Sequence, residues 1–497
     1  MYQITICSGA GKQTVPAGEG RLLGEVLREN IPAFAMPCAG NHTCGKCKVR
    51  VEGNVSAPEE AERRLLTEAE FADGTRLACA CRVQGDLTVT LREEGASKIV
   101  SWYETPAFER TETGYGFAVD IGTTTVALQL IDRASGKVLA ERLAENAQRG
   151  YGADVISRIE ACKEQGVEVL SDRISGQLET MAAECLQETG ITAVSESVVT
   201  GNATMLHIYE GLDPFSLSVV PFDVQSYFGC VSRRTLAGAP VYLPRCVGAY
   251  VGADIVCAVL AADLLNGGEQ LLADIGTNGE MVLAKDGKLL CCSTAAGPAF
   301  EGAGLSCGMP AAPGAVRAVK LENGAVTFET ITDQPVKGIC GSGILDALAV
   351  MLRTEAIDDS GYLEEDDWPV GDSGIAVTQK DVRQIQLAKS AVCAGLLTLM
   401  ETESIDAAEV RRFVIAGGFG STMNFDSATE IGLFPAALRA CTNFIGNGAL
   451  GGASMLLMNK ALREKSEQLA KDAVELSLSA NAGFMDYYVD CMSFMEF

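Results

Sequence analysis

The residues of this chain best suited to chemistry by type and spacing are four cysteines near the N-terminus. Cys38, Cys44 and Cys47 fall within ten residues, and Cys79 follows after a gap of 31 residues. The spacing C-x5-C-x2-C…C is close to the C-x4-C-x2-C…C run of one class of [2Fe-2S] sites, with one extra residue in the first gap. Glycine and asparagine residues between the cysteines allow the chain to curve around a compact cluster. The sequence therefore predicts that these four thiolates bind a [2Fe-2S] cluster.

Other ligand sets for this region stay open. Cys81 is a reserve candidate for the fourth ligand, because it lies two residues after Cys79 in RLACAC. A structural zinc ion is a second alternative, with Cys44, Cys47, Cys79 and Cys81 as its ligands. That set leaves Cys38 unused and contains a C-x-C pair, whereas structural zinc sites typically use C-x2-4-C. His42 also lies in the loop, but with four cysteines available we expect thiolate ligands.

A second set of residues suited to chemistry lies in an internal repeat. GFAVDIGTTTVALQLIDRASGKVLAE at 116–141 resembles QLLADIGTNGEMVLAKDGKLLCCS at 270–293. Each segment has the pattern of a buried strand, a D-x-G-T turn, a second strand, a glycine turn and a third strand. Further along, SVVTGNATML at 197–206 is similar to RFVIAGGFGST at 412–422. The sequence therefore predicts two copies of one α/β unit.

The two D-x-G-T turns have the residue types that hold phosphate. Backbone N–H groups and hydroxyls of such a turn can face phosphate oxygens, while Asp120 and Asp274 hold Mg²⁺ through water. One such turn alone would be a plain hairpin turn, but two copies 154 residues apart on matching strands favour a phosphate site. The expected contacts are Gly122, Thr123 and Thr124 in the first turn and Gly276, Thr277 and Asn278 in the second.

These turns resemble the phosphate motifs of the superfamily that includes acetate and sugar kinases, heat-shock chaperones and actin. By that resemblance the first phosphate motif is DIGTTT at 120–125, the second is DIGTNGE at 274–280, the connecting segment is GICGSG at 338–343, and the adenosine motif is IAGGFG at 415–420. The resemblance implies two ribonuclease H-like lobes that close on ATP and Mg²⁺. Further expected nucleotide contacts are Gly341, Ser342, Gly417, Gly418 and Gly420. Taken alone, IAGGFG would be a glycine turn that caps a helix.

The elements that position these residues divide the chain into several domains, as its length of 497 residues requires. Residues 1–92 have the pattern of a hairpin, a short helix, the cysteine loop and further alternating strands, which resembles a β-grasp [2Fe-2S] ferredoxin. Residues 93–114 carry mixed charge without periodicity and are expected to be a linker. The remaining boundaries are a first actin-like ATPase lobe at 115–265, a second at 266–480 and a C-terminal tail at 481–497.

Composition excludes several classes of function. The net charge of −26 argues against binding to nucleic acid or to anionic lipid, because both repel an acidic surface. The most apolar stretch, VGADIVCAVLAADLL, is interrupted by Asp254 and Asp263, so no membrane span is expected. Eighteen cysteines and the absence of a signal-peptide pattern at the first residues indicate a reducing cytoplasm.

The whole arrangement resembles the reductive activators of corrinoid proteins, which join a [2Fe-2S] domain to an actin-like ATPase. The resemblance extends to NAQRGYGADVISRI, STAAGPAFEGAGLSCGMP and FIGNGALGGA. It implies ATP-dependent passage of one electron from the cluster to cob(II)amide, which regenerates cob(I)amide for methyl transfer. The implied partners are a corrinoid protein of a methyltransferase system and an external low-potential electron donor. A homodimer is one assembly that the chain could form.

Two alternative functions remain from the same features. An ATP-dependent iron-sulfur activator of a radical dehydratase or reductase also joins an actin-like ATPase to iron and sulfur. Such activators typically hold a [4Fe-4S] cluster between subunits, whereas four cysteines in one domain favour [2Fe-2S]. A small-molecule kinase with an accessory ferredoxin domain would leave the four cysteines without a purpose.

Overall fold

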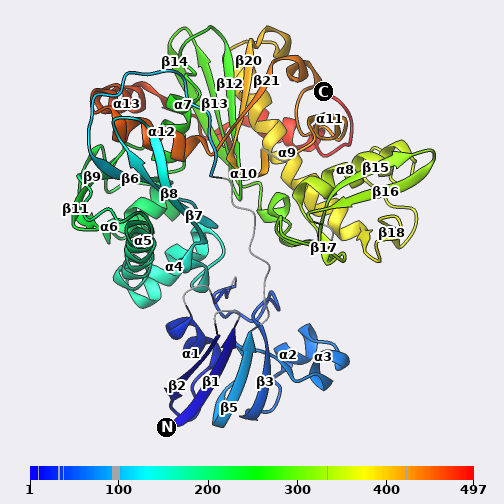
Figure 1. Cartoon of the computed structure of the whole chain (residues 1–497). Coiled ribbons are helices and arrows are strands. Elements are labelled where there is room, and N and C mark those ends of the chain that lie inside the picture. The colour runs from blue at the N-terminus through cyan, green and yellow to red at the C-terminus, as the bar shows by residue number, and fades with distance from the viewer. Residues whose placement is uncertain (9–10, 32–33, 37, 92–100, 333, 421–422) are drawn as a thin grey trace.

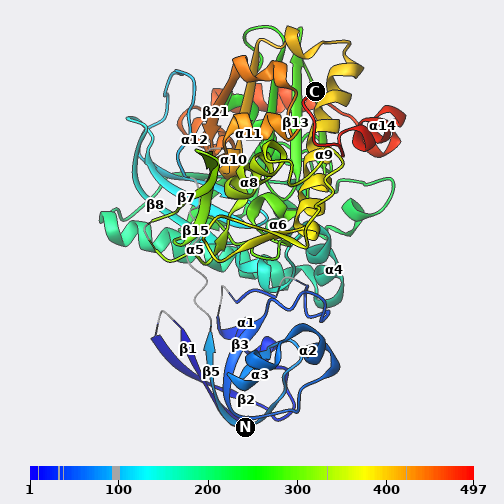
Figure 2. The ribbon, with the colours of Figure 1, turned by 90° about the vertical axis from the view of Figure 1, so that its right-hand side faces the viewer.

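The computed structural model shows a small β-rich domain beneath two larger sheets with their helices (Figure 1). The same view turned by 90° shows the small domain below α4 and α5 of the first lobe (Figure 2). The structure describes residues 1–8, 11–31, 34–36, 38–91, 101–332, 334–420 and 423–497.

The N-terminal domain is a five-stranded sheet in the order β2-β1-β5-β3-β4, with β1 parallel to β5. Ile4 and Ile6 of β1 alternate with exposed residues and pack with Leu23 and Leu27 of the helix, which is the period-2 pattern of a half-buried strand. The expected β-grasp arrangement is therefore present. Its elements are β1 (Tyr2–Ser8), β2 (Gly11–Ala17), α1 (Leu23–Asn30), β3 (Lys48–Val55), α2 (Glu60–Leu65), α3 (Glu68–Ala72), β4 (Thr75–Leu77) and β5 (Val83–Leu91).

The first lobe is a six-stranded sheet in the order β10-β11-β9-β6-β7-β8. Strands β6, β7 and β8 form an antiparallel meander, and β9 returns parallel to β6. Helices α4, α5 and α6 cover one face of the sheet. The elements are β6 (Tyr115–Ile121), β7 (Thr125–Asp132), β8 (Lys137–Glu145), α4 (Val155–Gln165), α5 (Val167–Thr189), β9 (Glu196–Gly201), α6 (Ala203–Glu210), β10 (Cys230–Leu236) and β11 (Ala239–Leu243).

The second lobe repeats this topology in the order β21-β20-β12-β13-β14-β22. Strand β20 lies parallel to β12 as β9 does to β6, which confirms the repeat expected from the sequence. Helices α8, α9 and α11 cover its outer face. The elements are β12 (Gln270–Ile275), β13 (Gly279–Lys285), β14 (Lys288–Thr294), α8 (Gly341–Arg353), α9 (Gln379–Thr402), β20 (Arg412–Ala416), α10 (Gly417–Gly420), α11 (Phe425–Glu430), β21 (Thr442–Gly446), α13 (Ala461–Asp472) and β22 (Val474–Glu475).

Two helices, α7 (Ala253–Ala261) and α12 (Gly448–Met458), share one apolar core with the inner faces of both sheets. At Gly452 of α12 any side chain would collide with the carbonyl oxygen of Cys257 on α7. This glycine lets the helices approach closely, so the two lobes share a single core.

An insertion and a tail complete the second lobe. The insertion carries β15 (Ala315–Glu322), β16 (Ala325–Thr330), β17 (Gly338–Ile339), β18 (Asp367–Pro369) and β19 (Ala376–Thr378). The tail carries α14 (Ala482–Asp490), which packs on α9. Buried Lys389 of α9 donates to the carbonyl of Ser493 at 2.7 Å. The C-terminal tail therefore packs against the second lobe.

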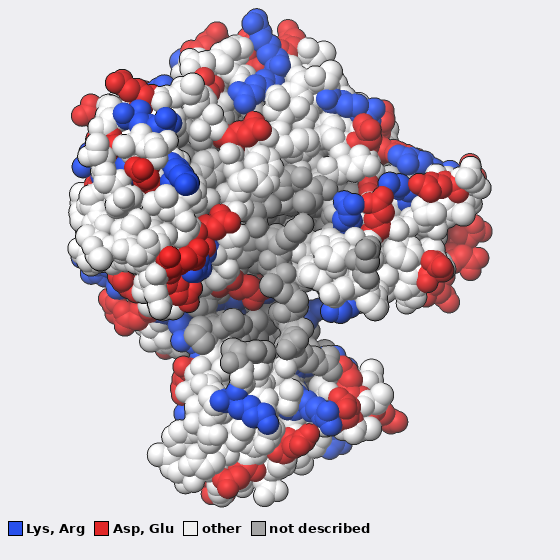
Figure 3. Space-filling view, viewed as in Figure 1, with Lys and Arg blue, Asp and Glu red and all other residues white. Residues whose placement is uncertain are grey.

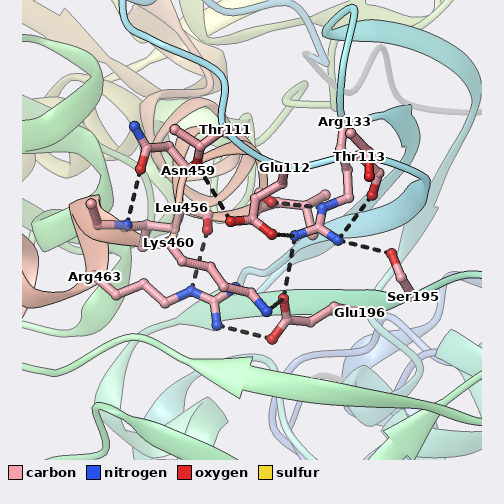
Figure 4. A network of polar contacts seen from close by, with 12 residues as sticks. Thr111, Glu112, Thr113, Arg133, Ser195, Glu196, Leu456, Asn459, Lys460 and Arg463 are labelled. Atoms are coloured by element: carbon pink, nitrogen blue, oxygen red, sulfur yellow. Dashed lines mark hydrogen bonds and ion pairs between the residues drawn. The ribbon is translucent and has the colours of Figure 1, made fainter.

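The expected linker differs from a free connection where it is described. Residues 93–100 lie outside the described residues, but 101–114 pack along the lobes (Figure 1). Tyr103 donates its hydroxyl to Ser454 of α12 at 2.8 Å and to Gln129 of β7 at 3.0 Å. Glu112 accepts from Arg133 at 2.9 Å (Figure 4). This segment therefore binds to both lobes rather than spanning solvent.

The same close-up shows a network of charged side chains that joins this segment, the first lobe and the region of α13 (Figure 4). Glu196 at the start of β9 pairs with Arg463 at 2.9 Å, Lys460 at 3.2 Å and Arg133 at 3.5 Å. Glu196 is only 7 % exposed, so each cation offsets a carboxylate that would otherwise be costly to bury.

The surface charge and the lengths of the helices can be described in the same way. Acidic and basic side chains are interspersed over the face in Figure 3, without a broad basic stripe there. The helices of the described residues include none that is both long and apolar enough to cross a membrane.

Candidate functional site

The four cysteines predicted as cluster ligands come together as two pairs. The thiols of Cys38 and Cys44 are hydrogen-bonded to each other, and so are those of Cys47 and Cys79. Cys79 lies in the turn between β4 and β5, and Ala78 beside it donates to the carbonyl of Cys47 at 2.9 Å. This turn brings the distant fourth thiol to the loop.

The electrostatics of these thiols are those of an interacting set. Burial opposes ionisation of Cys38, but hydrogen bonds from Thr43 and Cys44 lower the pKa of Cys38 to about 6. The hydrogen bond from Cys79 lowers the pKa of Cys47, while the pKa of Cys79 is raised by the same bond and by burial. Thiolates are the form that binds iron, so this donor set fits a cluster in which each iron takes two sulfur ligands.

Two alternative ligands lie in other surroundings. Cys81 is fully buried in the core of the domain, and burial together with nearby Glu62 and Glu59 raises its pKa to about 12, against the effect of Arg76. His42 places Nε2 3.0 Å from the carbonyl oxygen of Cys79, so its ring contacts the backbone. Among the described residues, no three His, Cys, Asp or Glu side chains converge on a single ion position.

A second centre lies between the lobes, where five carboxylates gather. Asp120 ends β6, Asp274 ends β12, and Asp254 lies in the first turn of α7. Glu280 stands opposite Asp274 in the β12–β13 ladder, and Glu301 follows the glycine-rich loop after β14. The two carboxylates predicted from the repeat therefore belong to a larger acidic cluster.

These carboxylates are half-buried, and all of them except Glu301 repel at least one other member of the cluster. Desolvation raises the pKa of Asp120 to about 6, although Asn447 donates to its carboxylate at 2.9 Å. Desolvation and the charge of Asp120 raise the pKa of Asp274 to about 7, and the same causes with the charge of Asp274 raise that of Asp254 to about 8. Crowded carboxylates of this kind are the ligands that a hard divalent cation stabilises.

The two D-x-G-T turns meet at one carboxylate. The hydroxyl oxygens of Thr124 and Thr277 lie 3.4 Å apart. Both hydroxyls donate to Glu301, each at 3.0 Å. Hydroxyls facing each other across the cleft can turn to phosphate oxygens once a ligand separates them.

Polar side chains hold the first turn from behind. Asn202, which caps α6, donates to the hydroxyl of Thr123 at 3.0 Å. Asn146 donates to the carbonyl of Gly122 at 2.8 Å, and Arg158 donates to the carbonyl of Thr123. With these carbonyls engaged from behind, the hydroxyl of Thr124 is left on the side that faces the second lobe.

The second turn is held by its own backbone. Gly276 donates to the carbonyl of Asn278 at 2.9 Å, and the side chain of Asn278 is hydrogen-bonded to Glu280. A cavity of about 30 Å³ is lined by Asn278, Glu280 and Asn202 among others, which is room for about two water molecules. A larger cavity of about 220 Å³ lies elsewhere, between residues 106–108 and helices α7, α12 and α13.

Of the glycines predicted to contact nucleotide outside the two turns, Gly417 and Gly341 lie close to members of the acidic cluster, whereas Gly420 lies in the core. Gly417 has φ +88°, and a side chain there would come within 2.5 Å of the Asp274 carboxylate. Gly341 lies against the carbonyl of Phe300, one residue before Glu301, and Gly418 is exposed at the start of α10. A side chain at Gly420 would instead meet Ile415 in the core.

Ser342 is not brought into the acidic cluster. Its hydroxyl donates to the carbonyl of Arg317 in β15 at 2.8 Å, so it joins α8 to the insertion. A small polar residue at the start of a helix gives no signal of which neighbour its hydroxyl will choose.

The sequence reasoning missed Asp254, Glu280, Glu301, Asn447 and Arg158 as members of the site. For Asp254 a signal existed, because a charge in an otherwise apolar helix requires a partner or a function. Glu301 lies in the glycine-rich loop at 293–304 and Asn447 in FIGNGALGGA, and neither residue had a role of its own in the predictions from sequence. Their convergence depends on packing between segments that are far apart in the chain.

Comparison with family models covers almost the whole chain. Residues 7–84 match a 2Fe-2S iron-sulfur cluster binding domain, 115–266 match the RACo middle region, and 269–496 match the C-terminal domain of RACo, the ASKHA domain. The first match agrees with the [2Fe-2S] cluster expected from the cysteine spacing.

Two curated relatives align with about three quarters of the chain. The corrinoid activation enzyme RamQ of Eubacterium limosum is 33% identical over 423 residues, covering 77% of this chain and 71% of RamQ. The [Co(II) methylated amine-specific corrinoid protein] reductase of Methanosarcina barkeri is 25% identical over 421 residues, covering 76% of this chain and 77% of the relative. Among solved structures, a reductive activator for corrinoid, iron-sulfur protein matches with a TM-score of 0.69 and 28% identity, covering 100% of this chain and 99% of that chain.

Proposed function

The chain belongs to the family of reductive activators of corrinoid proteins, and we propose that it uses ATP to drive one electron onto the cobalt of a corrinoid protein. The substrate cob(II)amide gains one electron and becomes cob(I)amide, the form that accepts a methyl group in a methyltransferase system. The electron enters from an external low-potential donor. About 1.4 kcal/mol is needed for each 59 mV that one electron is driven uphill.

The observation that supports this function best is the presence of both centres in one chain. Four thiols meet in the N-terminal domain, and two phosphate turns meet between the lobes. Neither centre alone couples a nucleotide to a reduction. Joined in one polypeptide, they supply the two parts that an ATP-dependent reductase requires.

In the N-terminal domain, Cys38, Cys44, Cys47 and Cys79 hold the [2Fe-2S] cluster. When bound, the cluster stores and releases one electron at a time. The loop residues exclude water from Cys47 and Cys79, which are both buried, and leave the Cys38 and Cys44 side partly accessible. The accessible side is therefore the side from which we expect the electron to leave.

Between the lobes, the acidic cluster holds Mg²⁺ and the turns hold the phosphates. Asp120 and Asp274 bind the cation through water, and Thr124 and Thr277 donate to phosphate oxygens. Gly417 keeps the space beside Asp274 clear for the nucleotide. The Mg²⁺ ion that accompanies ATP compensates the negative charge of these carboxylates.

The assembly and compartment complete the proposal. All eighteen cysteines are unpaired, which fits a reducing compartment, and we propose the cytoplasm. The proposed assembly is a homodimer. Sedimentation of the cluster-loaded protein, which gives the mass of the assembly, tests this proposal.

The test of function is direct. Anaerobically purified, reduced protein is mixed with candidate cob(II)amide proteins, with and without ATP, and the absorbance of cob(I)amide is followed. We expect formation of cob(I)amide that depends on ATP. Equal formation without nucleotide would remove the ATPase from the mechanism, and a protein without iron and acid-labile sulfide would remove the cluster.

A further inference from the structure

The N-terminal domain contacts a short segment of the first lobe, residues 147–152, which we call the seat. The guanidinium of Arg28 at the end of α1 lies over the ring of Tyr151, 4.4 Å from its centre. The amide of Met36 donates to the carbonyl of Arg149 at 3.4 Å. Met36 lies two residues before Cys38, so the domain is seated by the edge that leads into the cysteine loop.

The seat is a close contact. At Gly150 a side chain would come within 3.0 Å of the Phe34 carbonyl and 3.1 Å of the Arg28 side chain. From the neighbouring helix α5, Arg173 donates to the carbonyl of Arg28. Figures 1 and 2 both show the domain beneath α4 and α5, so the seat lies at the lower end of the first lobe.

Two side chains connect this seat to the first phosphate turn. Asn146 precedes the seat, donates to Gly122 through its side chain at 2.8 Å and to Thr124 through its backbone at 2.9 Å. The side-chain oxygen of the same residue accepts from the amide of Gln148 at 2.9 Å. The turn and the seat are therefore joined through one residue.

Arg158 of α4 makes the second connection. It donates to the carbonyl of Thr123 in the turn, to the carbonyl of Gly152 at 3.0 Å and to the side chain of Gln148 at 3.3 Å. Its three donor groups therefore hold both ends of the seat and the turn together.

The charge of Arg158 is consistent with a role beyond packing. The residue is fully buried, and the partners just described are neutral carbonyl and amide oxygens. A buried cation without a carboxylate in direct contact is costly to fold, and an anion nearby reduces that cost. The phosphate groups of a nucleotide in the first turn would be that anion.

Nucleotide entry must disturb this arrangement. Thr124 and Thr277 lie 3.4 Å apart and share Glu301, which leaves no room for a phosphate group between them. Phosphates that enter the cleft must therefore separate the two turns. The first turn is hydrogen-bonded to Asn146 and Arg158, so its displacement acts on the two residues that also hold the seat.

We propose that residues 146–158 are the docking surface of the N-terminal domain, and that nucleotide in the cleft releases the domain through Asn146 and Arg158. This inference rests on the proposed function, because it takes ATP as the ligand of the phosphate turns. Release frees the cysteine-loop edge of the domain to approach the cobalt of a partner protein. Asn146 and Arg158 are thus positioning residues that relate nucleotide occupancy to access to the cluster.

Two measurements on the cluster-loaded, full-length protein test the inference. Hydrogen exchange reports the amides of residues 120–125, 147–152 and 274–278, and small-angle X-ray scattering reports the radius of gyration. Each is taken with and without Mg²⁺ and a non-hydrolysable ATP analogue. We expect the analogue to slow exchange in both turns, to speed exchange at least threefold at 147–152, and to increase the radius of gyration.

Three variants distinguish the contact between the domain and the seat from the connection between the seat and the first turn. Tyr151→Leu removes the ring under Arg28 and is expected to give the larger radius without nucleotide, with an unchanged cluster spectrum. Tyr115→Leu, at an exposed tyrosine of the same lobe, is the matched control and should behave as wild type. Arg158→Lys keeps a positive charge but loses the fork, so the analogue should still protect 274–278 without enlarging the molecule.

The outcomes distinguish the inference from the function on which it rests. No protection of either turn by the analogue would mean that the proposed nucleotide site itself is wrong. Protected turns with an unchanged radius and an unchanged 147–152 segment would overturn the release mechanism alone. A wild-type increase in radius for Arg158→Lys would remove that residue from the connection.

Discussion

Thr124 and Thr277 are 153 residues apart in the chain, yet their hydroxyl oxygens lie 3.4 Å from each other. Their common acceptor, Glu301, receives a hydrogen bond of 3.0 Å from each. The duplicated unit therefore brings its two D-x-G-T turns into direct contact, while α7 and α12 form the core that the two lobes share. The predictions below concern the residues of these turns, the four thiols and the charged residues that surround them.

Replacement of Thr277 by valine should weaken nucleotide binding. Thr277→Val keeps the shape of the side chain but removes its donor, and one lost hydrogen bond to a charged phosphate costs about 1.5–3 kcal/mol. We expect affinity for Mg²⁺ and an ATP analogue to fall by roughly 10- to 100-fold. Calorimetric titration measures it, with Thr277→Ser as the control that should bind as wild type. Equal affinity for the valine variant would show that this hydroxyl does not contact phosphate.

Replacement of a paired thiol should remove the cluster, whereas replacement of Cys81 should not. Cys44→Ser removes one thiol of the Cys38–Cys44 pair. We expect loss of visible absorbance, iron and acid-labile sulfide, with nucleotide binding intact. Cys81→Ser is the matched control, because this thiol lies in the core near Arg76. A bleached Cys81→Ser together with a coloured Cys79→Ser would reverse the assignment of the fourth ligand.

Removal of the Asp274 charge should stop hydrolysis without touching the cluster. Asp274→Asn is expected to lower the rate of Mg-ATP hydrolysis by about 100-fold, equivalent to about 2.7 kcal/mol of barrier. Release of phosphate measures the rate, and the visible spectrum should stay unchanged. Asp286→Asn, at the exposed β13–β14 turn, is the control. A rate within a factor of two of wild type for Asp274→Asn would place the metal site elsewhere.

The acidic cluster should make stability fall as the pH rises in the absence of Mg²⁺. The pKa of Asp274 is raised to about 7 and that of Asp254 to about 8, both above the ordinary value of 3.8. The folded protein therefore keeps protons that the unfolded chain has lost. This contribution is complete below pH 3.8 and is lost as the pH rises through 7 and 8.

Mg²⁺ bound to ADP should show the opposite trend, because the cation favours the ionised carboxylates. We expect its thermal stabilisation of the protein to grow as the pH rises from about 6 to about 8. Differential scanning fluorimetry at constant ionic strength measures both trends. Asp254→Asn should flatten the metal-free trend, and the same slope in that variant would separate the pH dependence from this cluster.

Loss of the Glu196 charge should destabilise the junction of the two lobes (Figure 4). Glu196→Gln leaves Arg133 and Arg463 without their common carboxylate, and breaking a buried pair costs about 3 kcal/mol. We expect a lower denaturant midpoint at unchanged cluster content. Glu188→Gln, which breaks an exposed ion pair with Arg142, is the control and should shift the midpoint little. Equal shifts for the two variants would contradict the importance of burial here.

Local patterns in the sequence were enough to predict the main elements and a [2Fe-2S] site at the four thiols. Cysteine spacing is local, and a loop that must curve around a cluster keeps its glycines and thiols within a few residues. The repeat is also visible in the sequence, because strand, turn and strand are each set by neighbouring residues. For these reasons local sequence alone is enough to assign Cys38, Cys44 and Cys47, together with the turns that begin at Asp120 and Asp274.

Only the tertiary structure decided which residues from distant segments meet. Asp254 and Glu301 reach the turns because α7 and the loop after β14 pack against both lobes, and no local pattern encodes that contact. Ser342 is directed away from the cleft by the nearby carbonyl of Arg317. The seat of the N-terminal domain at Tyr151 likewise depends on how two folded surfaces fit, since Arg28 and Tyr151 lie far apart in the chain and find each other only through packing.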